Sequence, residues 1–322
     1  MLPPVQVANG LGTGMSFLLA SQVVRPVDHL AVNGTITEAE RELLLSDIDV
    51  YMLTNSIPAS LLFILVLIYF PSLPPSPPSL SSQQSRLQFS SGFRQVLTNW
   101  SCWLVSVGCS IPQGITVAWT AMMVVNLTQV CVSPDDCLTQ HWVNYLGVYT
   151  PLVSTIAAIL LARLADKFKG RLKEAVVGLL CLATLMFLLL SLISVGVFHF
   201  SSLLSLQVVV SVLLITGTSL TVSSMPLAME LTMELSYPAS EGVVGGFTSI
   251  WFNISTVMFL SLFSVPGIGT SWLDYVLPLA SLLAIPFVLP VRVQYHRLEL
   301  DTEHSATPGL NKYGATEVIS QN

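Results

Sequence analysis

The residues from Arg163 to Gly196 read RLADKFKGRLKEAVVGLLCLATLMFLLLSLISVG, and this stretch decides the fold of the chain. Lysine and arginine recur through its first third, and no charged residue follows Glu174. A helix that crosses a lipid bilayer needs about 20 predominantly apolar residues, and residues 174–196 supply that length. The stretch is therefore typical of a basic loop that leads into a membrane-spanning helix.

The composition of the whole chain also indicates a membrane protein. Hydrophobic residues make up 52% of the 322 residues and charged residues only 9%, whereas soluble proteins carry about 25% charged residues. A chain with so few charges cannot cover a water-facing surface. There is no basic patch with interleaved aromatic residues, so nucleic acid is not an expected partner, and the lipid bilayer is.

Further apolar stretches of similar length recur along the chain. We therefore predict an all-α polytopic membrane protein with eight transmembrane helices. The first predicted span is rich in glycine and is the weakest. The spans cover residues 5–24, 49–70, 100–126, 142–162, 174–196, 203–229, 243–265 and 272–291.

The basic residues predict the orientation of these spans. Of the 12 lysines and arginines, all but Arg25 and Arg41 lie in the gaps 71–99 and 163–173 or after residue 291. Those three segments share one side of the membrane if eight spans alternate. Cytoplasmic loops carry the excess of lysine and arginine, so we expect the tail to be cytosolic.

A Pro/Ser-rich segment divides the chain. Residues 71–99 are predicted to form an extended or disordered cytosolic linker, because proline blocks helices and serine buries little apolar surface. The linker separates two spans in residues 1–70 from six spans in residues 100–291, and residues 292–322 form the tail. Six spans after a long cytosolic linker are similar to the C-terminal half of a twelve-span transporter.

The predicted non-cytosolic gaps carry features of an oxidising, glycosylating compartment. Asn33 and Asn126 begin N-x-T sequons and are the predicted glycosylation sites. Cys131 and Cys137 lie in the same gap as Asn126. They either form a disulfide, which an oxidising lumen permits, or remain free thiols.

Two acidic residues near the cytosolic end of the sixth span are candidates for function. Glu230 and Glu234 are four positions apart and share one helix face. Two neighbouring carboxylates repel, and one can hold a proton, which suits a proton relay. The alternative is a latch, in which they pair with Arg163 or Lys167 and join the cytosolic ends of the helices.

The loop from Arg163 to Arg171 also suits a charge latch. Asp166 can accept a hydrogen bond from a neighbouring helix end or from an arginine, and Gly170 permits a tight turn. The loop is similar to the D-[RK]-x-G-[RK] signature of the major facilitator superfamily, with one residue inserted.

The third span contains the candidate substrate-binding residues. Pro112 and Gly114 are expected to break helical hydrogen bonding and free carbonyl groups toward a cavity. Gln113 could hydrogen-bond a solute, and Trp119 could stack on a ring or a cation. The alternative is a kinked helix with a packed tryptophan.

The sequence offers little support for an enzyme. The chain has no H-E-x-x-H, G-x-S-x-G, phosphate-loop or paired C-x-x-C motif, and its 5 histidines are scattered. We therefore predict neither an enzyme nor a metal site, and no cofactor.

The segment from Glu230 to Gly242 reads ELTMELSYPASEG. It resembles the E-x-x-x-E-x-x-Y-P-x-x-E-G segment of the feline leukaemia virus subgroup C receptor-related transporters, which belong to the major facilitator superfamily. The linker FPSLPPSPPS from Phe70 to Ser79 is also similar to that family. Choline-transporting members have an Asn-Gln pair in this region, and the present chain has none.

The resemblance implies a lysosomal membrane protein that moves pyridoxine with protons by alternating access. Relatives move choline, ethanolamine or haem instead. Gln113 and Trp119 would contact the solute. The residues implied in proton coupling or a cytosolic gate are Asp166, Arg163, Glu230, Glu234 and Glu241.

The resemblance also implies that about the first four helices of a twelve-helix fold are absent from this chain. Because a substrate path needs both halves of a transporter, the alternative to transport is a truncated, non-transporting regulatory isoform. The sequence does not predict an oligomeric state.

Overall fold

The computed structural model describes residues 2–25, 37–70, 89–133, 136–165 and 170–293, and these residues are almost entirely helical. The first helices are α1 (Leu2–Val23), α3 (Glu38–Ile68), α4 (Phe89–Thr98) and α5 (Trp100–Leu127). A short hairpin of β1 (Cys131–Ser133) and β2 (Asp136–Cys137) precedes α6 (Gln140–Ala165) and α7 (Leu172–Ser194). The last elements are α8 (Leu203–Leu235), α9 (Glu241–Ser261), the 3-10 turn η2 (Leu262–Ser264) and α10 (Leu273–Val288).

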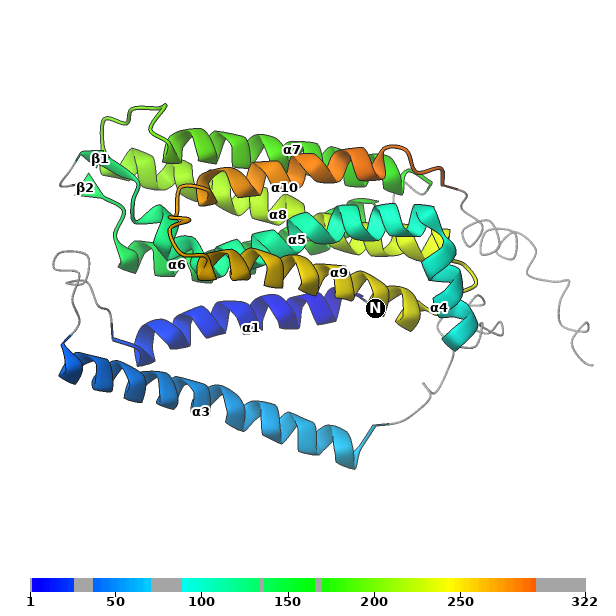
Figure 1. The fold of residues 1–322 in the computed structure, drawn as a ribbon, viewed down its shortest axis with the longest axis horizontal. Helices are drawn as coiled ribbons and strands as arrows, with labels where there is room; N and C mark the ends of the chain where they lie inside the picture. Colours follow the sequence, from blue (N-terminus) through cyan, green and yellow to red (C-terminus); the bar gives the residue numbers. More distant parts are fainter. Residues whose placement is uncertain (1, 26–36, 71–88, 134–135, 166–169, 294–322) are drawn as a thin grey trace, which may run out of the picture.

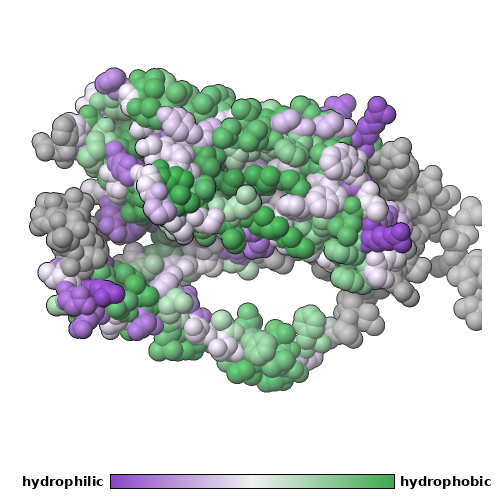
Figure 2. Space-filling view, in the orientation of Figure 1, coloured by the Kyte–Doolittle hydropathy of each residue, from purple (hydrophilic) through white to green (hydrophobic). Residues whose placement is uncertain are grey.

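The predicted all-α membrane fold is confirmed. Each of the eight predicted spans coincides with a helix, and α3, α5, α6, α7, α8 and α9 are long and apolar enough to cross a bilayer. Of the two others, α10 is apolar but has only 16 residues. In Figure 2, apolar side chains cover much of the flank of the bundle and of α3, and polar side chains gather mainly toward the two ends.

Helices α5 to α10 form the packed body of the protein. Helix α8 packs along α6 and α7, while α5 packs along α9 and α10 (Figure 1). The largest buried cluster includes Trp119, Met123, Phe187, Leu206 and Leu214. These long side chains fill the space between α5, α7 and α8, which fixes the positions of the polar groups on the same helices.

Helices α1 and α3 lie outside this body. Helix α1 packs along α6, and α3 makes only a few contacts with α1 (Figure 1). None of the side chains of α3 is buried. Much of the apolar surface of α3 is therefore available to lipid or to further helices.

The third span was expected to be broken at Pro112 and Gly114, but α5 runs unbroken through both residues. Helix α9 supplies the reason. Its Ser255 hydroxyl donates to the carbonyl of Ser110 (3.3 Å), and its Thr256 hydroxyl donates to the carbonyl of Gly114 (3.2 Å). Side chains of a neighbouring helix thus bond carbonyl groups beside the proline, as they do in other membrane helices.

The predicted linker is helical at its end. Residues 71–88 lie outside the described residues, but residues 89–98 form α4. This helix has its buried residues, Gly92 and Val96, on one side and packs against α9. Gly92 and Val96 lie one helical turn apart. A helix brings both of them against the bundle, so this part of the segment is helical instead of extended.

The structure joins Cys131 and Cys137 through a disulfide that closes the β1–β2 hairpin. The other cysteines are free: Cys102 and Cys109 are buried, and Cys181 is exposed. We expect maleimide to label three cysteines of the denatured, unreduced chain and all five after reduction. Mass spectrometry of the labelled protein measures this, and five labels without reductant would contradict the disulfide.

Candidate functional site

The two expected substrate-binding residues lie in the interior of the bundle. Gln113 is only 8% exposed, and its Oε1 atom has no hydrogen-bond partner among the described residues. A buried amide oxygen without a partner is costly. Gln113 therefore has an unused acceptor inside the membrane, which is what the recognition of a solute donor requires.

Trp119 is placed differently. Its ring is buried, and its Nε1 atom donates to the carbonyl of Leu273 in the first turn of α10 (3.1 Å). It lies six positions from Gln113 along α5, so the two side chains leave the helix on different faces. The structure therefore does not bring them together, and the indole N–H of Trp119 already has a partner within the protein.

The hydroxyl groups of α8 are mostly bonded to the backbone of the same helix. Thr221 donates to the carbonyl of Gly217 (3.0 Å) and Ser223 to that of Ser219 (2.6 Å). Ser219 also shares a hydrogen bond with Ser154 of α6 (3.1 Å). These residues join α6 to α8, so their polarity alone does not indicate a solute cavity.

The segment from Glu230 to Gly242 covers the end of α8, the turn at residues 236–240 and the first residues of α9. Ser240 is the N-cap of α9, and its hydroxyl accepts from the backbone N–H of Val243. The side-chain amides of Gln95, in α4, and of Asn99, the N-cap of α5, hold this turn. Asn99 donates to the carbonyl of Leu235 (2.7 Å), and Gln95 donates to the carbonyl of Tyr237 (3.1 Å).

This amide clamp was not predicted from the sequence. Gln95 and Asn99 lie in the stretch expected to be a linker, where polar residues are usual and nothing marked them. A hydrogen bond from Ser236 to the sulfur of Cys102 (3.2 Å) adds a further contact between α8 and α5. The ends of α4, α5, α8 and α9 on this side of the bundle thereby form one polar cluster.

The acidic residues on either side of the turn differ in exposure. Glu234 is 8% exposed, whereas Glu230 and Glu241 are on the surface. Arg163 is exposed at the end of α6 and makes no ion pair among the described residues. Asp166 lies outside the described residues, so the expected charge latch with this loop stays a prediction.

The opposite end of the bundle is closed by a second polar contact. The Nδ2 atom of Asn126 donates to the carboxylate of Asp274 (2.8 Å), which joins α5 to α10. Next to it, the Nε2 atom of Gln129 donates to the hydroxyl of Thr270 (3.2 Å). Asn126 is buried, and the nitrogen that would carry a glycan is already engaged. Asn33, the other predicted glycosylation site, lies outside the described residues.

A cavity of about 370 Å³ with a partly polar lining lies at this same end, between α1, α5 and α6. Gln22 and Arg25 contribute from the end of α1, and His141, Asn144 and Tyr145 from α6. Arg25 forms an ion pair with Asp47 of α3 (3.2 Å). A cavity with amides, a cation and aromatic rings suits a small polar solute. It could not be predicted from the sequence, because its lining comes from three separate segments. No group of His, Cys, Asp or Glu side chains in the described part of the chain could hold a metal ion.

Known proteins with similar sequences are solute carriers. No protein-family model matches the chain. A solute carrier family 49 member 4 homolog from Xenopus laevis is 26% identical over 91% of this chain and 62% of its own length. The corresponding homolog from Xenopus tropicalis is 27% identical over 74% of this chain and 51% of its own length.

The chain resembles solute carriers of family 49. A member A3 of that family from Danio rerio is also 26% identical, over 81% of this chain and 56% of its own length. These proteins are carriers and not enzymes, which agrees with the absence of catalytic motifs. The chain spans between half and two thirds of the length of the relatives it matches.

Proposed function

We propose that the chain acts in secondary-active, proton-coupled transport of a small organic solute, with pyridoxine as the first candidate. The observation that carries the proposal is the similarity to solute carriers over 91% of the chain. Apolar helices that enclose polar side chains support it. The membrane that fits the resemblance is the lysosomal one, with the C-terminus in the cytosol, as the distribution of basic residues predicts.

The proposed mechanism is alternating access, in which two groups of helices rock about a site near the middle of the membrane. Gln113 would accept a hydrogen bond from the solute through its unpaired Oε1 atom. Trp119 would offer only its ring, since its N–H is bonded to α10. The partly polar cavity between α1, α5 and α6 would admit the solute from the non-cytosolic side.

The contacts at the two ends of the bundle fit gates for this cycle. On the cytosolic side the gate would be the polar turn between α8 and α9, with Glu230, Glu234 and Glu241 and the basic loop containing Arg163 and Asp166. On the other side it would be the contact between Asn126 and Asp274. Each gate could open by breaking a few hydrogen bonds while the other gate stays closed.

Uptake into vesicles tests the proposal. We expect proteoliposomes that contain the chain to accumulate labelled pyridoxine when an inward proton gradient is imposed, and a protonophore to abolish the accumulation. Replacing Gln113 with Leu should lower uptake about tenfold, because the solute loses one buried hydrogen-bond acceptor.

Choline, ethanolamine and haem are measured in the same vesicles. Uptake of one of these in place of pyridoxine would overturn the assignment of substrate and leave transport in place. No flux of any of the four solutes would overturn transport itself and favour a regulatory role. The Leu variant is informative only if its melting temperature equals that of the parent chain.

A further inference from the structure

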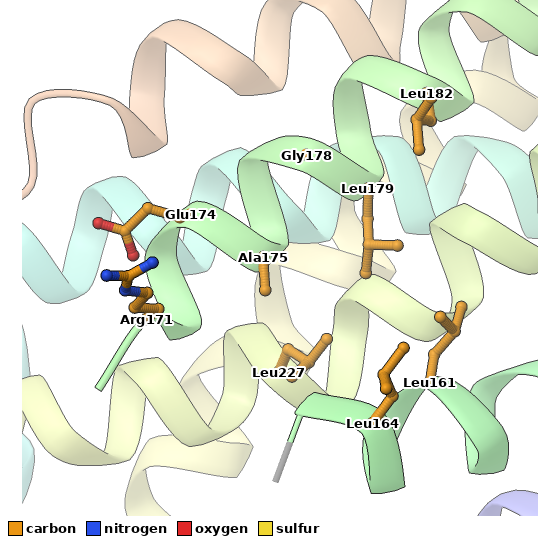
Figure 3. Close-up of a pocket in the computed structure, with 9 residues that line it drawn as sticks. All are labelled: Leu161, Leu164, Arg171, Glu174, Ala175, Gly178, Leu179, Leu182 and Leu227. Carbon is orange, nitrogen blue, oxygen red and sulfur yellow. The ribbon is translucent and has the colours of Figure 1, made fainter. Parts of the chain in front are cut away.

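A furrow runs between α6 and α7 on the outer surface of the bundle. Both helices pack along α8 and barely touch each other among the described residues. The gap between them is a cavity of about 370 Å³ whose walls are Leu161 and Leu164 from α6 and Leu179 and Leu182 from α7. Leu227 of α8 forms its floor (Figure 3).

The furrow is apolar along its length and open to its surroundings. Leu164 and Leu182 are about half exposed. Gly178 lies in the wall of the furrow, and a Cβ atom added there would meet no atom within 4 Å. Such a surface on a membrane helix faces acyl chains, and a furrow of this shape can hold one chain in a fixed position.

One end of the furrow is charged. Arg171 and Glu174 lie beside each other there, while leucine side chains follow the rest of the furrow (Figure 3). Neither charged side chain forms a hydrogen bond or an ion pair among the described residues. The two groups therefore offer one cation and one carboxylate at the membrane surface, next to an apolar furrow.

The same end is the N-terminus of α7. Arg171 is the N-cap residue of this 23-residue helix, and no side chain caps its free backbone N–H groups. Helix N-termini bind phosphate through these groups and through the helix dipole. An arginine at that position adds a cation that matches a phosphate. Arginine and the helix end thus favour an anion, and Glu174 favours a cation beside it.

We propose that the furrow binds a phospholipid of the cytosolic leaflet whose head group is zwitterionic and carries a primary amine. The phosphate contacts Arg171 and the N-terminus of α7, and the ammonium group donates to Glu174. One acyl chain lies along the leucines of α6, α7 and α8. An anionic head group without an amine would leave Glu174 facing a negative charge, and a quaternary amine could not donate a hydrogen bond to it. The site is independent of the proposed transport activity.

Lipid retention tests the site on the complete chain. The protein is purified in mild detergent from membranes that contain phosphatidylethanolamine, phosphatidylcholine and phosphatidylglycerol, and the bound lipids are quantified by mass spectrometry. We expect the parent chain to retain phosphatidylethanolamine over the other two. R171Q should reduce this retention about tenfold, as the loss of one charge-assisted hydrogen bond predicts. G178F should abolish it by filling the furrow.

Three further variants make the result specific. E174Q should erase the preference for phosphatidylethanolamine over phosphatidylglycerol while lipid is still bound. R94Q and G246F, an exposed arginine and an open glycine elsewhere, should leave retention unchanged. Equal retention by G178F and the parent chain, or equal binding of all three lipids by the parent chain, would overturn the proposal. Unchanged melting temperatures show that the variants are folded.

Discussion

Replacing Gly114 with Ala is expected to destabilise the protein, although alanine favours helices by about 1 kcal/mol over glycine. The reason is the close approach of α5 and α9. A Cβ atom at position 114 would lie 2.5 Å from the carbonyl oxygen of Phe252 and 3.0 Å from the hydroxyl of Thr256, and would overlap the hydroxyl of Ser255. The first of these is backbone, so it cannot move aside as a side chain can.

The expected loss for Gly114→Ala is about 1–3 kcal/mol, the usual cost of overpacking. Gly114→Leu should lose more, since α9 must separate from α5 and the hydrogen bonds from Ser255 and Thr256 must break. Thermal unfolding in detergent, followed by size-exclusion chromatography, measures both variants.

The matched control is Gly246 of α9, where a new Cβ atom meets nothing within 4 Å. Gly246→Ala should leave stability unchanged or raise it. If Gly114→Ala raised the melting temperature as well, helix propensity would dominate at both positions, and the contact between α5 and α9 would be looser than the structure shows.

The sequence predicts the helices of this chain well, because the feature that specifies them is local. A run of about 20 apolar residues marks a span wherever it occurs, and the spans from 174 to 196 and from 203 to 229 correspond closely to α7 and α8. Boundaries are predicted less well. Helix α8 continues to Leu235, past the predicted end, and Thr232 and Glu234 are buried in this extension.

The site is harder to predict, because its contacts join distant residues. Proline and glycine in α5 suggested a broken helix, but the hydroxyl groups that bond the neighbouring carbonyls come from α9, about 140 residues away. Trp119 was a candidate either for a solute contact or for packing in the bundle, and no local pattern indicated that its N–H would bond to Leu273. Gln95 and Asn99 were missed for the same reason, since the carbonyl groups they bind lie in another turn.

Replacing Glu234 with Gln is expected to change the proton dependence of transport. Glu234 is the one acidic side chain that is buried among the described residues. Gln keeps its volume and its hydrogen-bonding capacity but cannot take up or release a proton. If proton transfer at this position moves the turn between α8 and α9, the variant should lose the stimulation by a proton gradient, with uptake about tenfold lower under the gradient.

Glu42 of α3 is the matched control, because its side chain is exposed and lies outside both proposed gates. Glu42→Gln removes the same charge from a surface position, so its effect on uptake should be small. Initial rates with and without the gradient separate the two roles considered for Glu234. A proton relay predicts that the stimulation disappears, whereas a structural latch predicts slower uptake with the stimulation intact. Rates equal to those of the parent chain in both conditions would remove Glu234 from the mechanism and leave the amide clamp of Gln95 and Asn99 as the contact that closes this end of the bundle.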